Sequence, residues 1–435
     1  MNTGNYLNKL AAATFALFAF ASFTLAQTAK SSDPRPEKLL NNLKILMWQN
    51  ASSDKVAVKL RIHSGAAFDT LGKEGTMALL ADALFPNETV KEFFREDLNG
   101  GLSVESNYDY LQINAAGNAD QILTILETVA NAVTKPTLDK ETTAKVKAAR
   151  LEKIKELEKN PAYIADLAVA KRLFGDYPYG RSAEGTSESL AKIDFADLLL
   201  AKQRFLTADN ATLAVSGNIK YDYVFKAVRQ LFGGWEKADK KVPATFAQPS
   251  VPDAKEVSIE VSNSQYGLRR SALSVAGRND KDFYATKILT EIWRKQFCLN
   301  DESSLGKSSY QPFFLRGIYV IETKFPLNKP VELPVNTGGC LFMPYKDGKS
   351  VYPTISQSDF EQAKNKVVAE LNQKKQSVEM VDSWLDVDTY KLTSIKDELQ
   401  KANATSLADI QRVSENLQKQ PFAVVKTVKF GEAKQ

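Results

Sequence analysis

The sequence has very few of the residues on which nucleophilic and metal chemistry depend. Its 435 residues include one histidine, His63, and two cysteines, Cys298 and Cys340. A Ser-His-Asp or Cys-His catalytic arrangement would therefore have to use His63. A lone histidine is more often a satisfied core or surface residue than a ligand, so we interpret His63 as structural. The two cysteines are either bridged in an oxidising compartment or free, and the sequence leaves this open.

Long apolar runs are also scarce, and the main one stands at the N-terminus. Lys9 precedes an apolar run from Leu10 to Phe23, which Thr24-Leu25-Ala26 follows. This order of positive, apolar and small residues is typical of a secretory signal peptide, and the run is shorter than the ~20 residues of a membrane span. We predict a signal peptide at 1–26 and a periplasmic or secreted bacterial protein without membrane insertion. An uncleaved N-terminal anchor is the alternative.

No block of one charge sign interrupts the chain, although the formal net charge is +5. Where lysines gather, between Lys147 and Lys159, Glu152, Glu156 and Glu158 are interleaved at helical spacing. Such a pattern is typical of a solvated helix face. The charge distribution therefore predicts no nucleic-acid surface.

Hydrophobic periodicity predicts a first domain at 35–235 that contains both strands and helices. The expected strands are Lys55–Ile62, Leu111–Ala115 and Asn210–Ser216. The expected helices are Thr76–Leu84, Ala119–Val133, Lys140–Lys159, Tyr163–Phe174 and one that ends at Phe232. Strands mixed with helices in this order indicate an α+β domain.

The stretch 236–254 lacks periodicity and contains Pro243, Pro249 and Pro252, which predicts a linker. A second α+β domain is expected at 255–435. Its predicted strands are Glu256–Val261, Gly317–Lys324 and Phe422–Val428, and its predicted helices are Lys281–Phe297, Gln357–Lys374 and Leu407–Leu417. The last strand stands where Ala211–Ser216 stands in the first half, so we expect the halves to be a diverged duplication.

The segment from Val56 to Phe85 resembles the N-terminal signature of the M16 (pitrilysin or insulinase-like) zinc peptidases. It has a strand, a glycine-containing loop, and a glycine that opens a helix ending in Leu84-Phe85. In that family the helix carries H-x-x-E-H, in which the histidines at i and i+4 share one face and ligate Zn²⁺ while the glutamate accepts a proton. The resemblance implies two similar M16-type domains, each a mainly antiparallel sheet packed with helices.

The motif positions of this chain lack the zinc-binding residues that the resemblance implies. Anchored on Gly75, the two ligand positions are Ala78 and Asp82, and the base position is Ala81. The third ligand position, located from Asn160-Pro161, is Lys153, or Glu152 if the register slips by one residue. Alanine has no donor atom and an ammonium group repels a cation. We therefore predict no catalytic residue, no metal site and no zinc cofactor.

Other segments extend the resemblance over 43–235. They are Gly100–Ser106, Tyr177–Gly185, Asn210–Gly217 and Phe232–Trp235. In the family, the strand after the glycine pair is an edge strand that pairs with extended substrate, so the resemblance implies a peptide-binding edge at Leu102, Ser103, Val104, Glu105 and Ser106. An edge strand that only completes the sheet is the alternative. The family's substrate-holding Arg and Tyr are absent from Leu299–Ser309, where Glu302 and Ser309 stand instead, with Tyr310 one residue away.

The resemblance implies a non-catalytic subunit that pairs with an active M16 peptidase as a heterodimer and forms a chamber for unfolded or extended peptides. Two alternatives remain. The protein is either a free-standing periplasmic peptide-binding or envelope-assembly protein, or an active metallopeptidase with a rebuilt site.

Overall fold

The structure is a computed structural model that describes residues 33–238, 246, 249, 252, 255–261, 266–297, 306–326, 345–346, 349–350, 352, 354–374 and 379–429. The predicted signal peptide, both cysteines, Glu302 and most of the predicted linker lie outside these residues. Within the described part of the chain, no helix is long and apolar enough to span a bilayer.

The first half is built on a six-stranded sheet with the order β1-β2-β6-β3-β5-β4. Its strands are β1 (Arg35–Lys38), β2 (Lys44–Gln49), β3 (Lys55–Ile62), β4 (Gly101–Ser106), β5 (Leu111–Asn118) and β6 (Ala211–Gly217). β2 and β6 run parallel, and the other neighbours are antiparallel. β4 forms one edge of this sheet.

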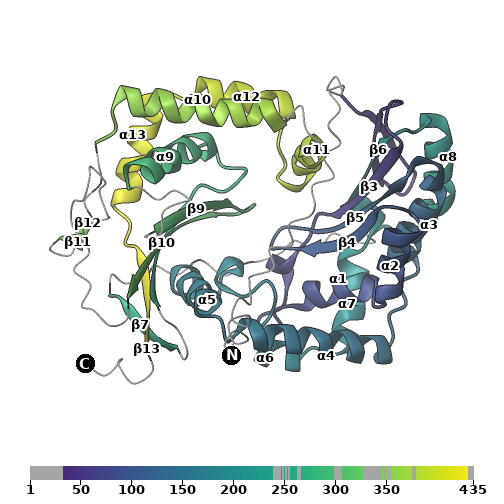
Figure 1. Ribbon diagram of the computed structural model, residues 1–435, viewed down its shortest axis with the longest axis horizontal. Helices are drawn as coiled ribbons and strands as arrows, with labels where there is room; N and C mark the ends of the chain where they lie inside the picture. The colour runs from purple at the N-terminus through teal and green to yellow at the C-terminus, as the bar shows by residue number, and fades with distance from the viewer. Residues whose placement is uncertain are drawn as a thin grey trace, which may run out of the picture.

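One face of the first sheet is covered by helices (Figure 1). They are α1 (Thr76–Leu84), α2 (Glu88–Glu96), α3 (Ile122–Thr134), α4 (Lys140–Leu157), α6 (Ser187–Ala191), α7 (Phe195–Phe205) and α8 (Tyr221–Phe232). Strand alternation turns Val58 and Leu60 of β3 toward these helices, where both are fully buried. The same alternation places Lys59 and Arg61 on the opposite face, which is where the second half contacts the sheet.

The second half repeats this topology on a five-stranded sheet with the order β7-β13-β8-β10-β9. Its strands are β7 (Val257–Val261), β8 (Tyr266–Val275), β9 (Gly306–Pro312), β10 (Gly317–Pro326) and β13 (Ala423–Lys429). Its covering helices are α9 (Phe283–Gln296), α10 (Gln357–Lys374), α12 (Ile395–Ala404) and α13 (Leu407–Gln418), and β11 (Tyr345–Lys346) pairs with β12 (Lys349–Ser350) outside the sheet. The order matches β2-β6-β3-β5-β4, with the parallel pair in the same place. The shared topology supports the expected duplication.

One helix of each half packs on the sheet of the other half, and we call these two the exchanged helices (Figure 1). α5 (Pro161–Phe174) comes from the first half but packs on β8 and β13, where Val169 and Phe174 meet Ala272 and Val425. α11 (Glu379–Thr389) comes from the second half and packs on β6 of the first sheet. Each sheet is therefore covered on one face by its own helices and on the other by a helix of the opposite half.

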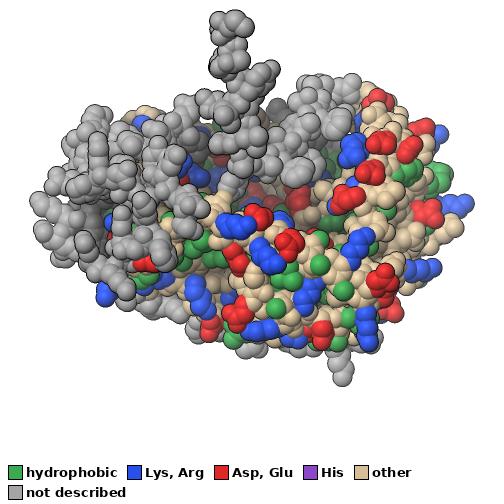
Figure 2. Space-filling model, turned by 60° about the horizontal axis from the view of Figure 1, so that its bottom comes forward, with side chains coloured by type: hydrophobic (Ala, Val, Ile, Leu, Met, Phe, Trp, Pro, Cys, Tyr) green, Lys and Arg blue, Asp and Glu red, His purple; other side chains and the backbone are tan. Residues whose placement is uncertain are grey.

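The surface that Figure 2 shows carries Lys and Arg side chains interspersed with Asp and Glu, without a patch of one sign. On α4 and just after its end, Lys155 pairs with Glu152 and Lys159 with Glu156, at 2.7 and 2.6 Å. These exposed pairs agree with the solvated helix face expected from the sequence.

Candidate functional site

The predicted motif lies on α1, whose start is fixed by a buried carboxylate. Gly75 precedes the helix with φ of 91°, a left-handed conformation that favours glycine. Asp69 accepts hydrogen bonds from the backbone N–H groups of Gly75 (2.8 Å) and Met77 (3.0 Å). Burial raises the pKa of Asp69 to about 7, although both N–H donors oppose that rise. The carboxylate thus satisfies two of the donors that a helix N-terminus leaves open.

A pair of glycines brings a second segment against this helix. A Cβ on Gly75 would lie 2.8 Å from the Cα of Gly185, and a Cβ on Gly185 would lie 2.8 Å from the carbonyl oxygen of Glu74. Only glycine at both positions permits this approach of the two segments. The contact places the neighbouring Glu184 beside α1 and α4, next to the predicted site.

Arg150 of α4 lies at the centre of the site. Its guanidinium donates through Nε and Nη2 to both carboxylate oxygens of Asp82, at 2.6 and 2.9 Å. Nη1 donates to Glu184 Oε2 at 2.7 Å, and Nη2 also donates to the carbonyl oxygen of Ala78 at 3.2 Å. The Arg150 side chain is only 6% exposed. One buried cation is therefore held by four oxygen atoms from α1 and the loop before α6.

Lys153 lies one helical turn beyond Arg150 and donates to the same Glu184 oxygen at 3.0 Å. Burial alone would raise the pKa of Glu184, but the charges of Lys153 and Arg150 outweigh it and lower that pKa. For Arg150 the signs are reversed. Burial alone would lower its pKa, but the hydrogen bonds and charges of Asp82 and Glu184 outweigh burial and raise that pKa. Two cations and two anions thus balance one another.

The residues at this site do not fit a zinc ion. The buried methyl groups of Ala78 and Ala81 offer no donor, and Asp82 already binds Arg150 through both oxygens. A guanidinium stays protonated in proteins, so it cannot make room for a divalent cation by losing its charge. In the residues that the structure describes, no three His, Cys, Asp or Glu side chains are grouped as metal ligands.

Sequence reasoning located Ala78, Ala81, Asp82 and Lys153 but missed Arg150 and Glu184. The structure brings Asp82 and Lys153 together only through these two residues. Arg150 stands three residues before Lys153, at the spacing that places two side chains on one helix face. That spacing was a signal for Arg150, whereas no local pattern marks Glu184.

The predicted peptide-binding strand is β4, and the structure places it at the edge of the first sheet. Its partner is β5, with Val104 opposite Ile113 in the register. Leu102 is buried, and Val104 packs partly buried against the core. Glu105 is exposed and accepts a hydrogen bond from Asn114 at 2.8 Å. β4 also packs beside α1, the helix that carries Ala78 to Asp82.

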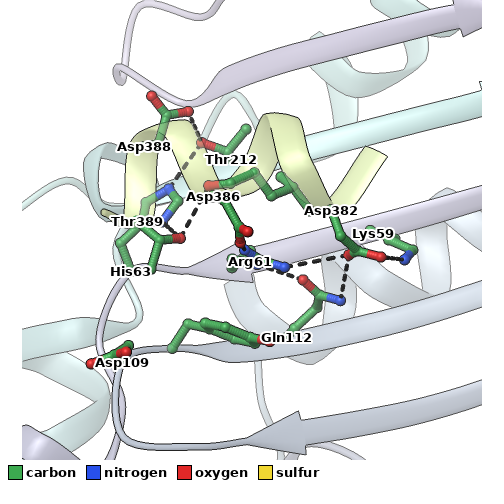
Figure 3. Close-up of polar contacts among 12 residues, drawn as sticks. Lys59, Arg61, His63, Asp109, Gln112, Thr212, Asp382, Asp386, Asp388 and Thr389 are labelled. Carbon is green, nitrogen blue, oxygen red and sulfur yellow. Dashed lines mark hydrogen bonds and ion pairs between the residues drawn. The ribbon is translucent and has the colours of Figure 1, made fainter. Parts of the chain in front are cut away.

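On the face of the sheet away from its own helices, α11 is held by charged side chains (Figure 3). Arg61 of β3, which is 1% exposed, contacts Asp386 at 2.7 Å and Asp382 at 3.3 Å. Lys59 also pairs with Asp382, at 2.5 Å, and Gln112 accepts from Arg61 Nε at the same distance. These contacts bind the second half to the first sheet.

His63 lies within this interface and not near α1. One ring nitrogen contacts the Thr389 hydroxyl at 3.0 Å and the other the Thr212 hydroxyl at 2.9 Å, and Thr212 in turn donates to Asp388 (Figure 3). Burial lowers the pKa of His63 to about 3. The histidine is therefore neutral at ordinary pH and satisfied on both sides, which agrees with the structural role expected for it.

Comparisons with solved structures show the same fold over nearly the whole chain. A protease from Helicobacter pylori matches with a TM-score of 0.77 and 14% identity, covering 91% of this chain and 100% of the other. A peptidase M16 inactive domain from Pseudomonas fluorescens matches with a TM-score of 0.72 and 18% identity, covering 92% of this chain and 98% of the other. At such identities the likeness concerns the fold alone.

Relatives in sequence come from Rickettsia bellii and Rickettsia felis, and both carry the description uncharacterized zinc protease. Each is 23% identical, over 211 residues (47% of this chain and 50% of the relative) and over 219 residues (48% and 52%), respectively. The chain therefore matches about half the length of these curated relatives.

The family model "Insulinase (Peptidase family M16)" matches residues 44–187, and "Peptidase M16 inactive domain" matches residues 192–294. Since these two stretches make up more than half of the sequence, the chain belongs to peptidase family M16, the insulinase family.

Proposed function

We propose that this chain is a non-catalytic M16 subunit that pairs with an active M16 zinc peptidase and completes a chamber for peptide processing. The observation that carries the proposal is the guanidinium of Arg150, which binds Asp82, Glu184 and the carbonyl of Ala78 beside the motif positions. At these positions a zinc peptidase requires a divalent cation and a metal-bound water. In this chain the permanently charged guanidinium of Arg150 lies there instead. The chain therefore has no group with which to activate water there.

Peptide binding does not depend on those lost residues. β4 offers backbone N–H and C=O groups at the sheet edge, and strand addition uses these groups irrespective of the side chains. The subunit would thus align an extended peptide and leave its cleavage to the zinc-bearing partner. Following the expected signal peptide, we place this assembly in the periplasm.

The test of pairing is purification of the native protein from its own cell envelope, followed by zinc analysis and a peptide-cleavage assay. We expect the isolated chain to contain no stoichiometric zinc and to cleave nothing, while the purified complex contains about one zinc per pair and cleaves unfolded peptides. An isolated chain with about one zinc would contradict the loss of catalysis. A chain that binds peptides but purifies alone would favour the free-standing peptide-binding or envelope-assembly protein.

The test of the edge strand uses two neighbouring prolines, Ser103→Pro and Val104→Pro. Successive N–H groups of an edge strand point in opposite directions, so one proline removes a bond to β5 and the other removes a donor at the open edge. Because the Asn107 N–H donates to the Tyr110 carbonyl at 3.0 Å, alternation turns the Ser103 N–H toward β5 and the Val104 N–H to the open edge. We expect Ser103→Pro to lose stability and Val104→Pro to fold normally but lose peptide capture. If the well-folded variant still binds peptides unchanged, β4 only completes the sheet.

A further inference from the structure

The junction between the two halves contains a buried carboxylate, that of Asp109, in the turn between β4 and β5. Asp109 is 6% exposed. Its Oδ1 accepts from the Tyr179 hydroxyl at 3.0 Å, and its Oδ2 accepts from the backbone N–H of Phe314 at 3.1 Å. Tyr390 also lies close enough to lower the pKa of Asp109. Because Tyr179 belongs to the first half and Phe314 to the second, this one side chain is bonded to both halves.

The turn that contains Phe314 is inserted among aromatic side chains of the first half. The ring centroid of Phe313 lies 4.7 Å from that of Tyr179 and 4.9 Å from that of Tyr108. The next backbone N–H, of Leu315, donates to the Tyr179 hydroxyl at 3.0 Å. Separating the halves at this point must therefore break the hydrogen bonds of Asp109 and Tyr179 together.

No cation pairs with Asp109 among the residues that the structure describes. The titratable groups that face it are the phenols of Tyr108, Tyr177, Tyr179 and Tyr390 and the carboxylate of Asp386. The nearby cations act elsewhere, since Arg61 pairs with Asp386 at 2.7 Å and Arg316 acts on Tyr177. Burial raises the pKa of Asp109 to about 6, and the donors from Tyr179, Phe314 and Tyr390 limit that rise.

We propose that Asp109 is a proton-dependent latch, in which proton uptake strengthens the closed contact between the two halves. The contact between the halves survives protonation, because a carboxyl protonated on Oδ1 donates to the Tyr179 oxygen while Oδ2 still accepts from the Phe314 N–H. A carboxyl that titrates near 6 when closed and near its ordinary value when solvated binds a proton more tightly in the closed form. The contribution to closure is therefore complete below about pH 4 and is lost as the pH rises through about 6.

The size of the effect follows from the two titration points. A rise of the pKa from 3.8 to about 6 permits at most a roughly 100-fold change in the closing equilibrium. Residual burial of Asp109 in the opened form reduces this limit. Between pH 8 and pH 4.5, where the contribution is not yet complete, the two pKa values allow at most a roughly 30-fold change, and we expect about fivefold to 30-fold.

Hydrogen exchange at the backbone amides of Phe314 and Leu315 measures the opening directly, after correction for the intrinsic exchange rate at each pH. The full chain should show protection of these amides that increases as the pH falls. The amide of Leu60, in the buried β3, reports global unfolding and separates the latch from the titration of Asp69, which lies within the first half. The matched control is Asp176→Asn, which removes an exposed carboxylate on the loop that leads to Tyr179.

Asp109→Asn imitates the protonated form, and its turn should be protected equally at all pH values, whereas Asp176→Asn should behave as the wild type. Should Asp109→Asn not fold, Tyr179→Phe serves instead, read at the Phe314 amide, because the loss of the hydroxyl that donates to the carboxylate moves the midpoint to higher pH. Protection of the turn that does not change with pH, or that changes equally in Asp109→Asn, would overturn the proposal. An unmoved midpoint in Tyr179→Phe would do the same.

Discussion

Arg150 is the residue whose replacement tests the interpretation of the motif site most directly. Arg150→Met keeps much of the side-chain volume but removes the charge that Asp82 and Glu184 share. It leaves two carboxylates near each other, with only Lys153 as a counter-ion for Glu184. We expect the variant to be less stable at neutral pH, because both anions lose the donors that compensated for their partial burial.

The magnitude lies between two limits. Removing one partner of a fully buried ion pair costs about 3 to 5 kcal/mol, whereas exposed pairs contribute roughly 0 to 1 kcal/mol. Arg150 is 6% exposed, but Asp82 and Glu184 are 38% and 35% exposed, so solvent screens part of the effect. We therefore expect a loss of about 2 kcal/mol. Arg150→Lys should retain part of the stability, since an ammonium keeps the charge but cannot span Asp82 and Glu184 with a fork of donors.

The sharpest control is the triple variant Arg150→Met, Asp82→Asn and Glu184→Gln, which removes the charges together. With no unpaired anion left, it should be more stable than Arg150→Met alone, so the three changes are not additive. Urea unfolding followed by circular dichroism measures the midpoints of all variants at pH 7. A triple variant that is less stable than the single one, or a loss below about 0.5 kcal/mol for Arg150→Met, would refute this account of the site.

Three further predictions concern metal binding, helix docking and pH. Restoring the motif should require Arg150 to be removed as well, so zinc analysis should detect metal in a fivefold variant with Ala78→His, Ala81→Glu, Asp82→His, Lys153→Glu and Arg150→Ala and in no single variant. Leu385→Ala, at a fully buried contact of α11, should cost about 2 to 5 kcal/mol in urea unfolding, while exposed Leu200→Ala should cost little. The pKa of Asp69 is raised to about 7 in the folded protein, so the contribution of this group to stability is complete below its ordinary pKa and is lost as the pH rises through 7. Thermal unfolding from pH 4 to 8 should show this decline in stability. Asp69→Asn should reduce the decline.

Elements with a strong hydrophobic period were predictable from the sequence. Lys55–Ile62, Thr76–Leu84 and Gln357–Lys374 have the predicted bounds in the structure. The predicted helix Ala119–Val133 starts with a 3-10 turn at Ala119–Gln121 and becomes α-helical at Ile122. Lys55–Ile62 buries alternate residues, as its period of two predicts, whereas Thr76–Leu84 is buried on nearly every side and shows as a continuous apolar run.

The exchanged helix α11 and the neighbouring α12 were not predicted. α11 (Glu379–Thr389) contains both apolar and acidic residues: Met380, Val381 and Leu385, and Asp382, Asp386 and Asp388. This composition matches the sheet face on which the helix lies. That face presents apolar Leu46 and Trp48 beside basic Arg61 and Lys44. A helix with a partly charged contact face gives no clean apolar stripe. The strand side chains that hydrogen-bond to α11 stand between 176 and 344 residues earlier in the chain, at separations that a local sequence pattern does not relate.

At the candidate site, too, some residues could be found from the local sequence, and others only from contacts between distant segments. Ala78, Ala81 and Asp82 were found because the motif is contiguous and its glycine and Leu-Phe anchors fix the register. Glu184 reaches the site through the approach of Gly185 to Gly75, which is a contact between loops. The motif positions can therefore be recognised from the sequence, whereas the approach of Glu184 to them can be recognised only from the fold.

The two helices that pack on the sheet of the opposite half also show what holds the two halves together. Arg61 of β3 binds α11 through Asp382 and Asp386. Arg270 lies on β8, the corresponding strand of the second sheet, and binds α5 through Asp166 at 2.7 Å. Glu322 of β10 pairs with the same arginine. Both arginines are nearly fully buried. Such networks contribute little net stability, so we interpret them as setting the position of each helix on its sheet, while the apolar contacts around Leu385 and Val169 supply the free energy. Contacts of β3, β8, α5 and α11 thus hold the two helices on the sheets of the opposite halves. None of these elements contributes a residue to the motif site on α1 and α4, so a change of side chains at that site leaves these contacts intact.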